Sequence, residues 1–172
     1  NASHLALSPD GNHLYTAAAG DNGVGIFSRT AATGALTFVG IRVDGASQGA
    51  LVLDGLAGAA AVAVSPDGAH LYVAGEADHG VAAFSRATAS GQLTFLEAEK
   101  DGVAGVDGLA GASALALSPD GRHLYVAAAG DGAVAVFARD AAAASPEFGR
   151  LAFVAALFDG TAQGALVVDG LA

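Results

Sequence analysis

SPDGNHLY, at residues 8–15, is the stretch that decides the fold of this chain of 172 residues, because the chain contains it three times with only one position changed. It returns as SPDGAHLY at residues 65–72 and as SPDGRHLY at residues 118–125. The first residues of the three copies are 57 and 53 positions apart. A repeat of this kind indicates a supersecondary unit that buries its hydrophobic faces against its neighbours in the chain.

Four short segments in each repeat predict β-strands. The first alternates large and small residues with period two, and the second begins at the histidine that follows SPDG. Turns rich in Pro, Gly, Asp and Asn separate the segments. In the order of the repeats they are LAL, HLYTA, VGIF and ALTFV; VAV, HLYVA, VAAF and QLTFL; and LAL, HLYVA, VAVF and LAFVA. Because no segment keeps a helical period, four antiparallel strands per repeat predict the blades of a β-propeller.

The repeat also resembles a known family. SPDGxHLYVA, followed by D-x-x-V-x-V-F-x-R and T-G-x-L-T-F, is similar to the YVTN and lactonase-like β-propeller repeats of bacteria and archaea. The expected fold class is therefore all-β, a β-propeller domain over residues 1–172 with three four-stranded antiparallel blades at about 1–57, 58–110 and 111–172. The third repeat departs by an insertion, AAAASPEFG, and the second by a shorter linker to the next repeat. The resemblance implies a lactonase, a surface-layer protein or a binding module.

Three blades are fewer than the four to eight that close a propeller, so apolar blade faces would stay bare at both ends. Joining GALVVDGLA at the end to NASHLALSPDG at the start reproduces the length of the internal joint at residues 49–68. We therefore expect two copies to pair head to tail as a homodimer with six blades. A part of a longer propeller and a larger ring are the alternatives. The expected assembly interface consists of Leu5, Leu7, Leu115 and Leu117.

The net charge of −10, from 17 acidic and 7 basic residues, argues against a nucleic-acid partner. In an up-and-down blade, the turns between the second and third strands and the linkers between blades share one face. That face, here called the acidic face, is expected to carry most of the excess negative charge. Its acidic residues are Asp21, Asp44, Asp54, Glu76, Asp78, Asp101, Asp107, Asp131, Asp159 and Asp169, and its basic residues are Arg42 and Lys100. A concave acidic mouth attracts Ca²⁺, another cationic ligand or a basic protein.

The candidate ligand- or cation-binding residues on this face are Asp21, Glu76, Asp78, His79 and Asp131. The competing interpretation is turn chemistry, because the three aspartates each fall eight residues after the repeated histidine, where a hairpin favours Asp, Asn or Gly. His79 breaks the repeat, as does His4. The repeated His13, His70 and His123 are expected to be solvated or hydrogen-bonded strand starts, and the repeated arginines, Arg29, Arg86 and Arg139, to pair with nearby acids such as the SPDG aspartates.

No residue is assigned a catalytic role, because no nucleophile elbow, phosphate loop or metalloprotease motif occurs. The chain has no cysteine and no apolar run long enough to predict a membrane span. The sequence does not decide the cellular location, and an extracellular or periplasmic one is favoured. The main functional expectation is a non-enzymatic propeller module that assembles with its own copy and presents the acidic face for binding or scaffolding. The alternative is a lactonase-like hydrolase with its site at the channel mouth of the assembled ring.

Overall fold

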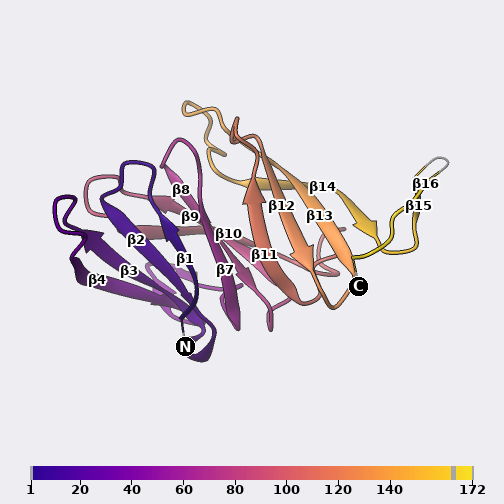
Figure 1. Cartoon of the computed structure of the whole chain (residues 1–172), viewed down its shortest axis with the longest axis horizontal. Coiled ribbons are helices and arrows are strands. Elements are labelled where there is room, and N and C mark those ends of the chain that lie inside the picture. The colour runs from indigo at the N-terminus through magenta and orange to yellow at the C-terminus, as the bar shows by residue number, and fades with distance from the viewer. Residues whose placement is uncertain (1, 164–165, 172) are drawn as a thin grey trace.

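The computed structural model describes residues 2–163 and 166–171, and three four-stranded antiparallel sheets dominate it (Figure 1). Each sheet follows chain order, as expected for a propeller blade. Blade 1 consists of β1 (Ala2–Leu7), β2 (His13–Ala18), β3 (Gly23–Arg29) and β4 (Leu36–Val43). Blade 2 consists of β7 (Ala59–Val64), β8 (His70–Gly75), β9 (Gly80–Arg86) and β10 (Leu93–Lys100). Blade 3 consists of β11 (Ala112–Leu117), β12 (His123–Ala128), β13 (Ala133–Arg139) and β14 (Leu151–Phe158). The β-propeller prediction is confirmed.

Two small hairpins in the linkers were not predicted. They are β5 (Ser47–Gln48) with β6 (Leu51–Val52), and β15 (Ala162–Gln163) with β16 (Leu166–Val167). Strands of two residues carry no periodicity that a sequence pattern could reveal. A short 3-10 turn, η1 (Ala19–Asp21), connects β2 to β3.

The SPDG phrase forms the turn between the first two strands of every blade. In blade 1, the Ser8 hydroxyl donates to Asp10 Oδ1 at 2.5 Å, and the same carboxylate oxygen accepts the Asn12 N–H at 3.0 Å. The His13 N–H then donates to Ser8 Oγ at 3.0 Å. Gly11 closes the turn with φ at +71°, a conformation that favours glycine. The turn is therefore specified by the phrase itself, which explains why the phrase is repeated.

The hydrophobic core lies between the blades. One cluster joins Tyr15, Val24 and Ile26 of blade 1 to residues of blade 2 such as Phe84 and Leu93. A second cluster joins blade 2 to blade 3 in the same manner. The innermost strand β7 lies beside both β1 and β11, so the first strands of the blades surround the axis of the propeller. Each interface between two blades is called a seam below.

A buried arginine crosses each seam. Arg86 of blade 2 donates from Nε to Tyr15 Oη at 2.7 Å and from Nη2 to Asp10 Oδ2 at 3.0 Å, both in blade 1. Its Nη2 also donates to His13 Nδ1 at 2.9 Å. The Tyr15 hydroxyl donates in turn to the Gly91 carbonyl at 2.9 Å. The predicted pairing of the repeated arginines with SPDG aspartates is thus confirmed for Arg86, and the pair links neighbouring blades.

The second seam repeats this network. Arg139 of blade 3 donates to Tyr72 Oη at 2.7 Å, to Asp67 Oδ2 at 2.7 Å and to His70 Nδ1 at 2.8 Å, all in blade 2. Phe148, from the inserted segment of the third repeat, packs edge-on against the His70 ring with centroids 4.4 Å apart. The expected strand start was solvated or hydrogen-bonded, and the hydrogen-bonded alternative holds for both seam histidines, which are buried.

The seam shifts the pKa values of its members. Burial, reinforced by the Arg139 charge, lowers the pKa of His70 to about 4, and the same causes, with Arg86, lower that of His13. The hydrogen bond from Ser8, aided by that from the Asn12 N–H, lowers the pKa of Asp10 far below its usual range. The histidines are therefore neutral in the folded protein at pH 7 and accept a hydrogen bond from a permanently charged guanidinium.

We expect the stability to fall on acidification between pH 6.5 and about 4. In the unfolded chain the His70 imidazole takes up a proton near pH 6.5. In the folded protein it does so only near pH 4, because its pKa there is about 4. The shift corresponds to a loss of roughly 3 kcal/mol in the free energy of unfolding across this window. Urea denaturation at pH 7 and pH 4 measures it.

Replacing His70→Gln should make this loss smaller, because Gln does not titrate. His13→Gln, at the equivalent position of the first seam, should also make the loss smaller, because burial and Arg86 lower the pKa of His13 as well. Equal pH dependence in the wild type and the His70 variant would contradict the assignment.

Candidate functional site

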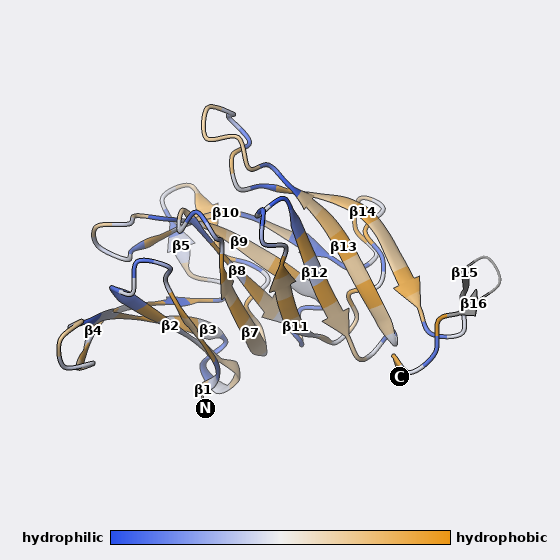
Figure 2. Ribbon diagram, turned by 45° about the horizontal axis from the view of Figure 1, so that its top comes forward, coloured by the Kyte–Doolittle hydropathy of each residue, from blue (hydrophilic) through white to orange (hydrophobic). Residues whose placement is uncertain are grey.

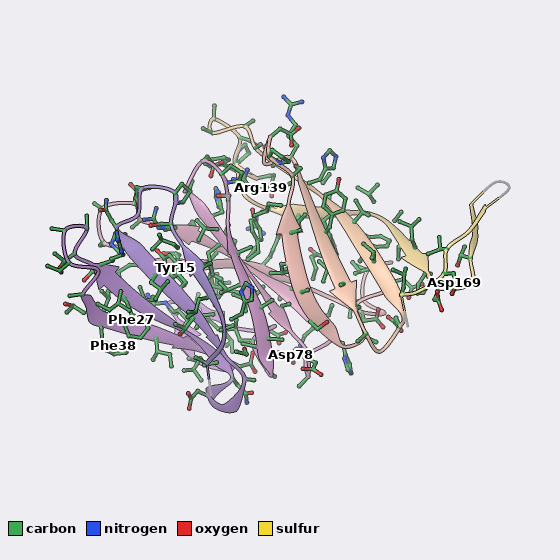
Figure 3. All side chains as sticks on the ribbon, in the orientation of Figure 1. Tyr15, Phe27, Phe38, Asp78, Arg139 and Asp169 are labelled. Carbon is green, nitrogen blue, oxygen red and sulfur yellow. The ribbon has the colours of Figure 1, made fainter. Side chains whose placement is uncertain are left out.

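Among the described residues, two groups of three aspartates lie on the acidic face where a linker meets the next blade. The first is Asp44, Asp54 and Asp78, and the second is Asp101, Asp107 and Asp131. In each group the candidate ligand atoms lie within 4.8 Å of one another. Asp78 lies at the opposite end of the sheets from Arg139 (Figure 3), as expected for the two faces of a propeller. These groups are called the first and second carboxylate clusters.

The clusters hold the linkers in place. Asp44 accepts the Leu56 N–H at 3.1 Å, and Asp78 accepts the Ala57 N–H at 2.9 Å. In the second cluster Asp101 and Asp131 accept the equivalent Leu109 and Ala110 N–H groups at 2.9 and 2.8 Å. Asp78 and Asp131 therefore have a structural role, but through bonds to the preceding linker rather than within their own hairpin turns.

A lysine distinguishes the two clusters. Lys100 Nζ lies 2.6 Å from Asp54 Oδ1 and 3.2 Å from Asp78 Oδ1, so the first cluster contains its own cation. In the strand register of blade 2, Lys100 of β10 lies opposite Gly80, the first residue of β9. The residue at the equivalent position of blade 3 is Phe158, opposite Ala133 of β13. Among the described residues the second cluster has no ion pair. Of the two, the second is the one whose oxygens could hold a metal ion such as Ca²⁺.

The pKa values reflect this arrangement. Burial, together with the charges of Asp78 and Asp54, raises the pKa of Asp44. Burial acts in the same direction on Asp78, but the hydrogen bonds from Ala57 and Lys100 outweigh it and lower the pKa of Asp78. Burial would lower the pKa of Lys100, yet its hydrogen bonds to Asp54 and Asp78 raise it. Lys100 therefore helps to keep Asp78 ionised beside Asp44, whose carboxyl is harder to ionise.

A separate open pocket of about 330 Å³ surrounds Glu76 and His79. Its lining includes Gly58 and Gly111, which directly precede the innermost strands β7 and β11, so the pocket lies at the mouth of the propeller axis. The turn between β8 and β9 places the His79 side chain in this pocket, and the backbone of His79 has φ at +51°. His79 Nδ1 accepts the Gly111 N–H at 3.0 Å, which leaves the proton of the neutral ring on Nε2.

Blade 2 departs from its sister blades at these two positions. The residues equivalent to Glu76 are Ala19 and Ala129, and those equivalent to His79 are Asn22 and Gly132. Asn22 Oδ1 accepts the Gly58 N–H at 2.9 Å, so it performs the same linker contact as His79 Nδ1. The linker contact therefore needs only an acceptor, and it does not explain an imidazole or a nearby carboxylate.

The candidate site residues from the sequence do not form one site. Asp78 and Asp131 belong to different carboxylate clusters, Glu76 and His79 share the pocket, and Asp21 lies in η1 of blade 1. Four further cluster members, Asp44, Asp54, Asp101 and Asp107, have no predicted role in the sequence beyond the charge of the acidic face. The recurring DGLA at residues 54–57 and 107–110 is the sequence signal that points to two of them.

The structure also separates the four leucines expected at the assembly interface. Leu5 and Leu7 of β1 are exposed at the outer face of blade 1. Leu115 and Leu117 of β11 pack against the core cluster between blades 2 and 3. An interface between copies would therefore use Leu5 and Leu7, whereas the two leucines of β11 serve a seam inside the chain.

Comparison with known proteins places these blades in a family. The family model described as lactonase, 7-bladed beta-propeller, matches residues 50–156. The chain belongs to this lactonase family of seven-bladed β-propellers. No curated protein matches it. Since the family includes lactonases, the comparison supports the hydrolase alternative better than the non-enzymatic expectation.

Solved structures of lactonase-like propellers are similar over most of this chain. The periplasmic gluconolactonase of Pseudomonas aeruginosa is 26% identical with a TM-score of 0.69, over 97% of this chain and 39% of that protein. A protein from Lactobacillus plantarum is 26% identical with a TM-score of 0.72, over 93% and 42%. The chain spans about two-fifths of the length of these structures. No helix in residues 2–163 and 166–171 is long and apolar enough to cross a membrane.

Removing the cation of the first carboxylate cluster, Lys100, should destabilise the folded protein. Lys100→Met leaves three carboxylates together, and we expect the free energy of unfolding at pH 7 to fall by roughly 1 to 3 kcal/mol. Adding Asp44→Asn in the same chain should recover part of the loss, because one of the repelling charges is removed. Thermal unfolding followed by circular dichroism measures both, and a larger loss in the double variant would contradict this account.

Calcium should act on the second carboxylate cluster. We expect millimolar Ca²⁺ to raise the Tm of the wild type, by an amount that corresponds to about 1.4 kcal/mol when Ca²⁺ is ten times its Kd. Asp107→Asn should reduce the rise, whereas the matched Asp54→Asn in the lysine-filled cluster should not. The same Tm with Ca²⁺ and with a chelator would remove calcium from consideration.

Proposed function

We propose that this chain is part of a lactonase-like hydrolase that opens an uncharged lactone at the pocket of Glu76 and His79. The observation that carries the proposal is the family match over residues 50–156, which includes this pocket. The 26% identity to a protein described as a periplasmic gluconolactonase supports the substrate class. The main expectation from the sequence, a non-enzymatic module, has less support from these comparisons.

The two side chains can supply the proton transfer and the hydrogen bond that lactone hydrolysis needs. The Glu76 carboxylate accepts a proton from a water molecule as the water oxygen forms a bond to the lactone carbonyl carbon. His79 Nε2–H donates a hydrogen bond to the carbonyl oxygen, on which negative charge develops. Glu76 then gives its proton to the ring oxygen as the bond from the carbonyl carbon to that oxygen breaks, so the product is a hydroxy acid and the carboxylate is restored.

The charge of the acidic face favours a neutral substrate. Ten acidic residues share this face with Arg42 and Lys100. Arg42 donates to the Leu93 carbonyl and Gln92 Oε1, and Lys100 pairs with Asp54 and Asp78, so both cations are already engaged. A phosphorylated lactone would meet a repulsive potential at the mouth. The carboxylate product of a neutral lactone would meet the same repulsion, which aids its release.

The repeat supplies matched variants for the test. Glu76→Ala and His79→Asn give blade 2 the residues that its sister blade 1 already has, and Asn keeps an acceptor for the Gly111 N–H at a left-handed position. We expect the wild type to hydrolyse glucono-1,5-lactone faster than the spontaneous rate and faster than it hydrolyses the 6-phosphorylated lactone. Each variant should lose about tenfold to a thousandfold in kcat/KM with an unchanged Tm.

Glu147→Gln, which removes an exposed acid on the opposite face, should keep full activity. Turnover is measured by the acid released at constant pH. No turnover above the spontaneous rate would refute the hydrolase proposal, and full activity in both pocket variants would refute the assignment of Glu76 and His79.

A further inference from the structure

The linker between blades 2 and 3, residues 101–111, donates three consecutive N–H groups to side chains. In chain order the bonds are Leu109 to Asp101 Oδ1 at 2.9 Å, Ala110 to Asp131 Oδ2 at 2.8 Å and Gly111 to His79 Nδ1 at 3.0 Å. The first two acceptors belong to the second carboxylate cluster, and the third lines the pocket of the proposed function. Adjacent amides of one linker therefore join the cluster to the pocket.

Asp131 holds Ala110 at two points. Its Oδ2 accepts the Ala110 N–H, and its own N–H donates to the Ala110 carbonyl at 3.2 Å. That carbonyl and the Gly111 N–H belong to one planar peptide unit, so holding Ala110 also fixes the direction in which the Gly111 N–H points. A Cβ on Gly111 would lie 2.7 Å from the Gly130 nitrogen, because the linker passes directly over the turn that carries Asp131.

The two turns that the linker connects belong to one rigid frame. His79 lies in a turn of blade 2 and Asp131 in a turn of blade 3, and the second hydrophobic cluster packs these blades together. Figure 2 shows that the strands of both blades are mostly hydrophobic. Asp131 itself lies outside the lining of the pocket. Its contact with His79 therefore runs through the linker.

The linker between blades 1 and 2 has the same arrangement with a different acceptor. Asp78 holds Ala57 at the same two points, from the Ala57 N–H to Oδ2 at 2.9 Å and from its own N–H to the Ala57 carbonyl at 3.3 Å. The next N–H, that of Gly58, donates to Asn22 Oδ1 at 2.9 Å. Asn22 and His79 are equivalent, with φ at +48° and +51°. Because an amide oxygen and an imidazole nitrogen accept the same bond, the held linker sets its direction.

The direction of the Gly111 N–H determines which nitrogen of His79 carries the proton. A neutral imidazole has one donor and one acceptor nitrogen, and a hydrogen bond at one of them assigns the other. With Nδ1 as the acceptor, the proton is on Nε2, where it can be donated to the carbonyl oxygen of a lactone. In the other tautomer Nε2 would be an acceptor and would repel the negative charge that develops on that oxygen.

From these contacts we infer that Asp131 is a positioning residue of the pocket: it holds Ala110 so that the Gly111 N–H donates to His79 Nδ1 and keeps the imidazole proton on Nε2. The catalytic consequence rests on the proposed hydrolase, whereas the tautomer does not. Asp131 thereby acts from a neighbouring blade on a histidine that it does not touch.

The tautomer is read from the ¹⁵N chemical shifts of the imidazole rings, at alkaline pH, with a chelator and without substrate. His79→Asn identifies the His79 signals among those of the five histidines. We expect the wild type to carry the proton on Nε2. Asp131→Ala should lower the ratio of the Nε2–H to the Nδ1–H form about twofold to tenfold, the factor by which one hydrogen bond shifts an equilibrium. Asp131→Asn keeps an acceptor for the Ala110 N–H and should restore the ratio.

Asp44→Ala is the matched control. It releases the Leu56 N–H of the other linker, whose third amide donates to Asn22 and not to an imidazole, and should leave the tautomer ratio unchanged. Asp101→Ala releases the Leu109 N–H of the same linker and should lower the ratio, so the inference stays testable if Asp131→Ala does not fold. An equal change in the Asp44 variant would overturn the inference.

Turnover of glucono-1,5-lactone separates this inference from the proposed hydrolase. Asp131→Ala should lower kcat about twofold to tenfold with KM unchanged, because the bond from Nε2–H to the carbonyl oxygen strengthens in the transition state. A changed tautomer ratio in a protein without turnover would support the positioning role and refute the hydrolase. An unchanged ratio in folded Asp131→Ala would overturn the positioning role, whether or not the lactone is hydrolysed.

Discussion

The burial of a guanidinium between blades is the interaction on which the structure depends. An uncompensated charge in a protein interior is strongly destabilising, so Arg86 and Arg139 require every one of their acceptors in the preceding blade. That requirement fixes the distance and register of neighbouring sheets, which packing of alanine-rich apolar faces alone would define less sharply. The SPDG turn positions the aspartate, the following strand places the histidine and tyrosine, and the third strand ends at the arginine. The motif recurs in every blade because each internal seam is built from the same hydrogen-bond network.

The local structure could be predicted from the sequence because it is encoded locally. Strand alternation and the SPDG turns gave the three sheets, and the repeat gave their number. Pairing of the arginines with SPDG aspartates was also predictable from residue type, but not that Arg86 reaches Asp10 of the preceding blade, because that contact depends on how whole sheets stack. For the same reason the sequence did not show that Lys100 neutralises one carboxylate cluster while Phe158 leaves its equivalent without a cation.

Repetition also separates structural from functional residues. Positions that agree in all three blades, such as the SPDG aspartates and the tyrosines, serve the seams. Glu76 and His79 stand where the sister blades have residues without acid–base chemistry, although one of these, Asn22, still makes the linker contact. Candidate chemistry is thus added to one turn of one blade without disturbing the scaffold. This is the arrangement expected when function resides in loops carried on a rigid fold.

Phe148 makes the two internal seams unequal. It comes from the insertion in the third repeat, packs on His70 and lies 5.5 Å from the Arg139 guanidinium, whereas His13 has no aromatic neighbour of this kind among the described residues. The polar network between blades 2 and 3 is therefore better shielded from water than the one between blades 1 and 2. Local opening should begin where shielding is weakest. The amide hydrogens of β1–β4 should exchange with solvent before those of β7–β14, so the chain should unfold from its first blade inward.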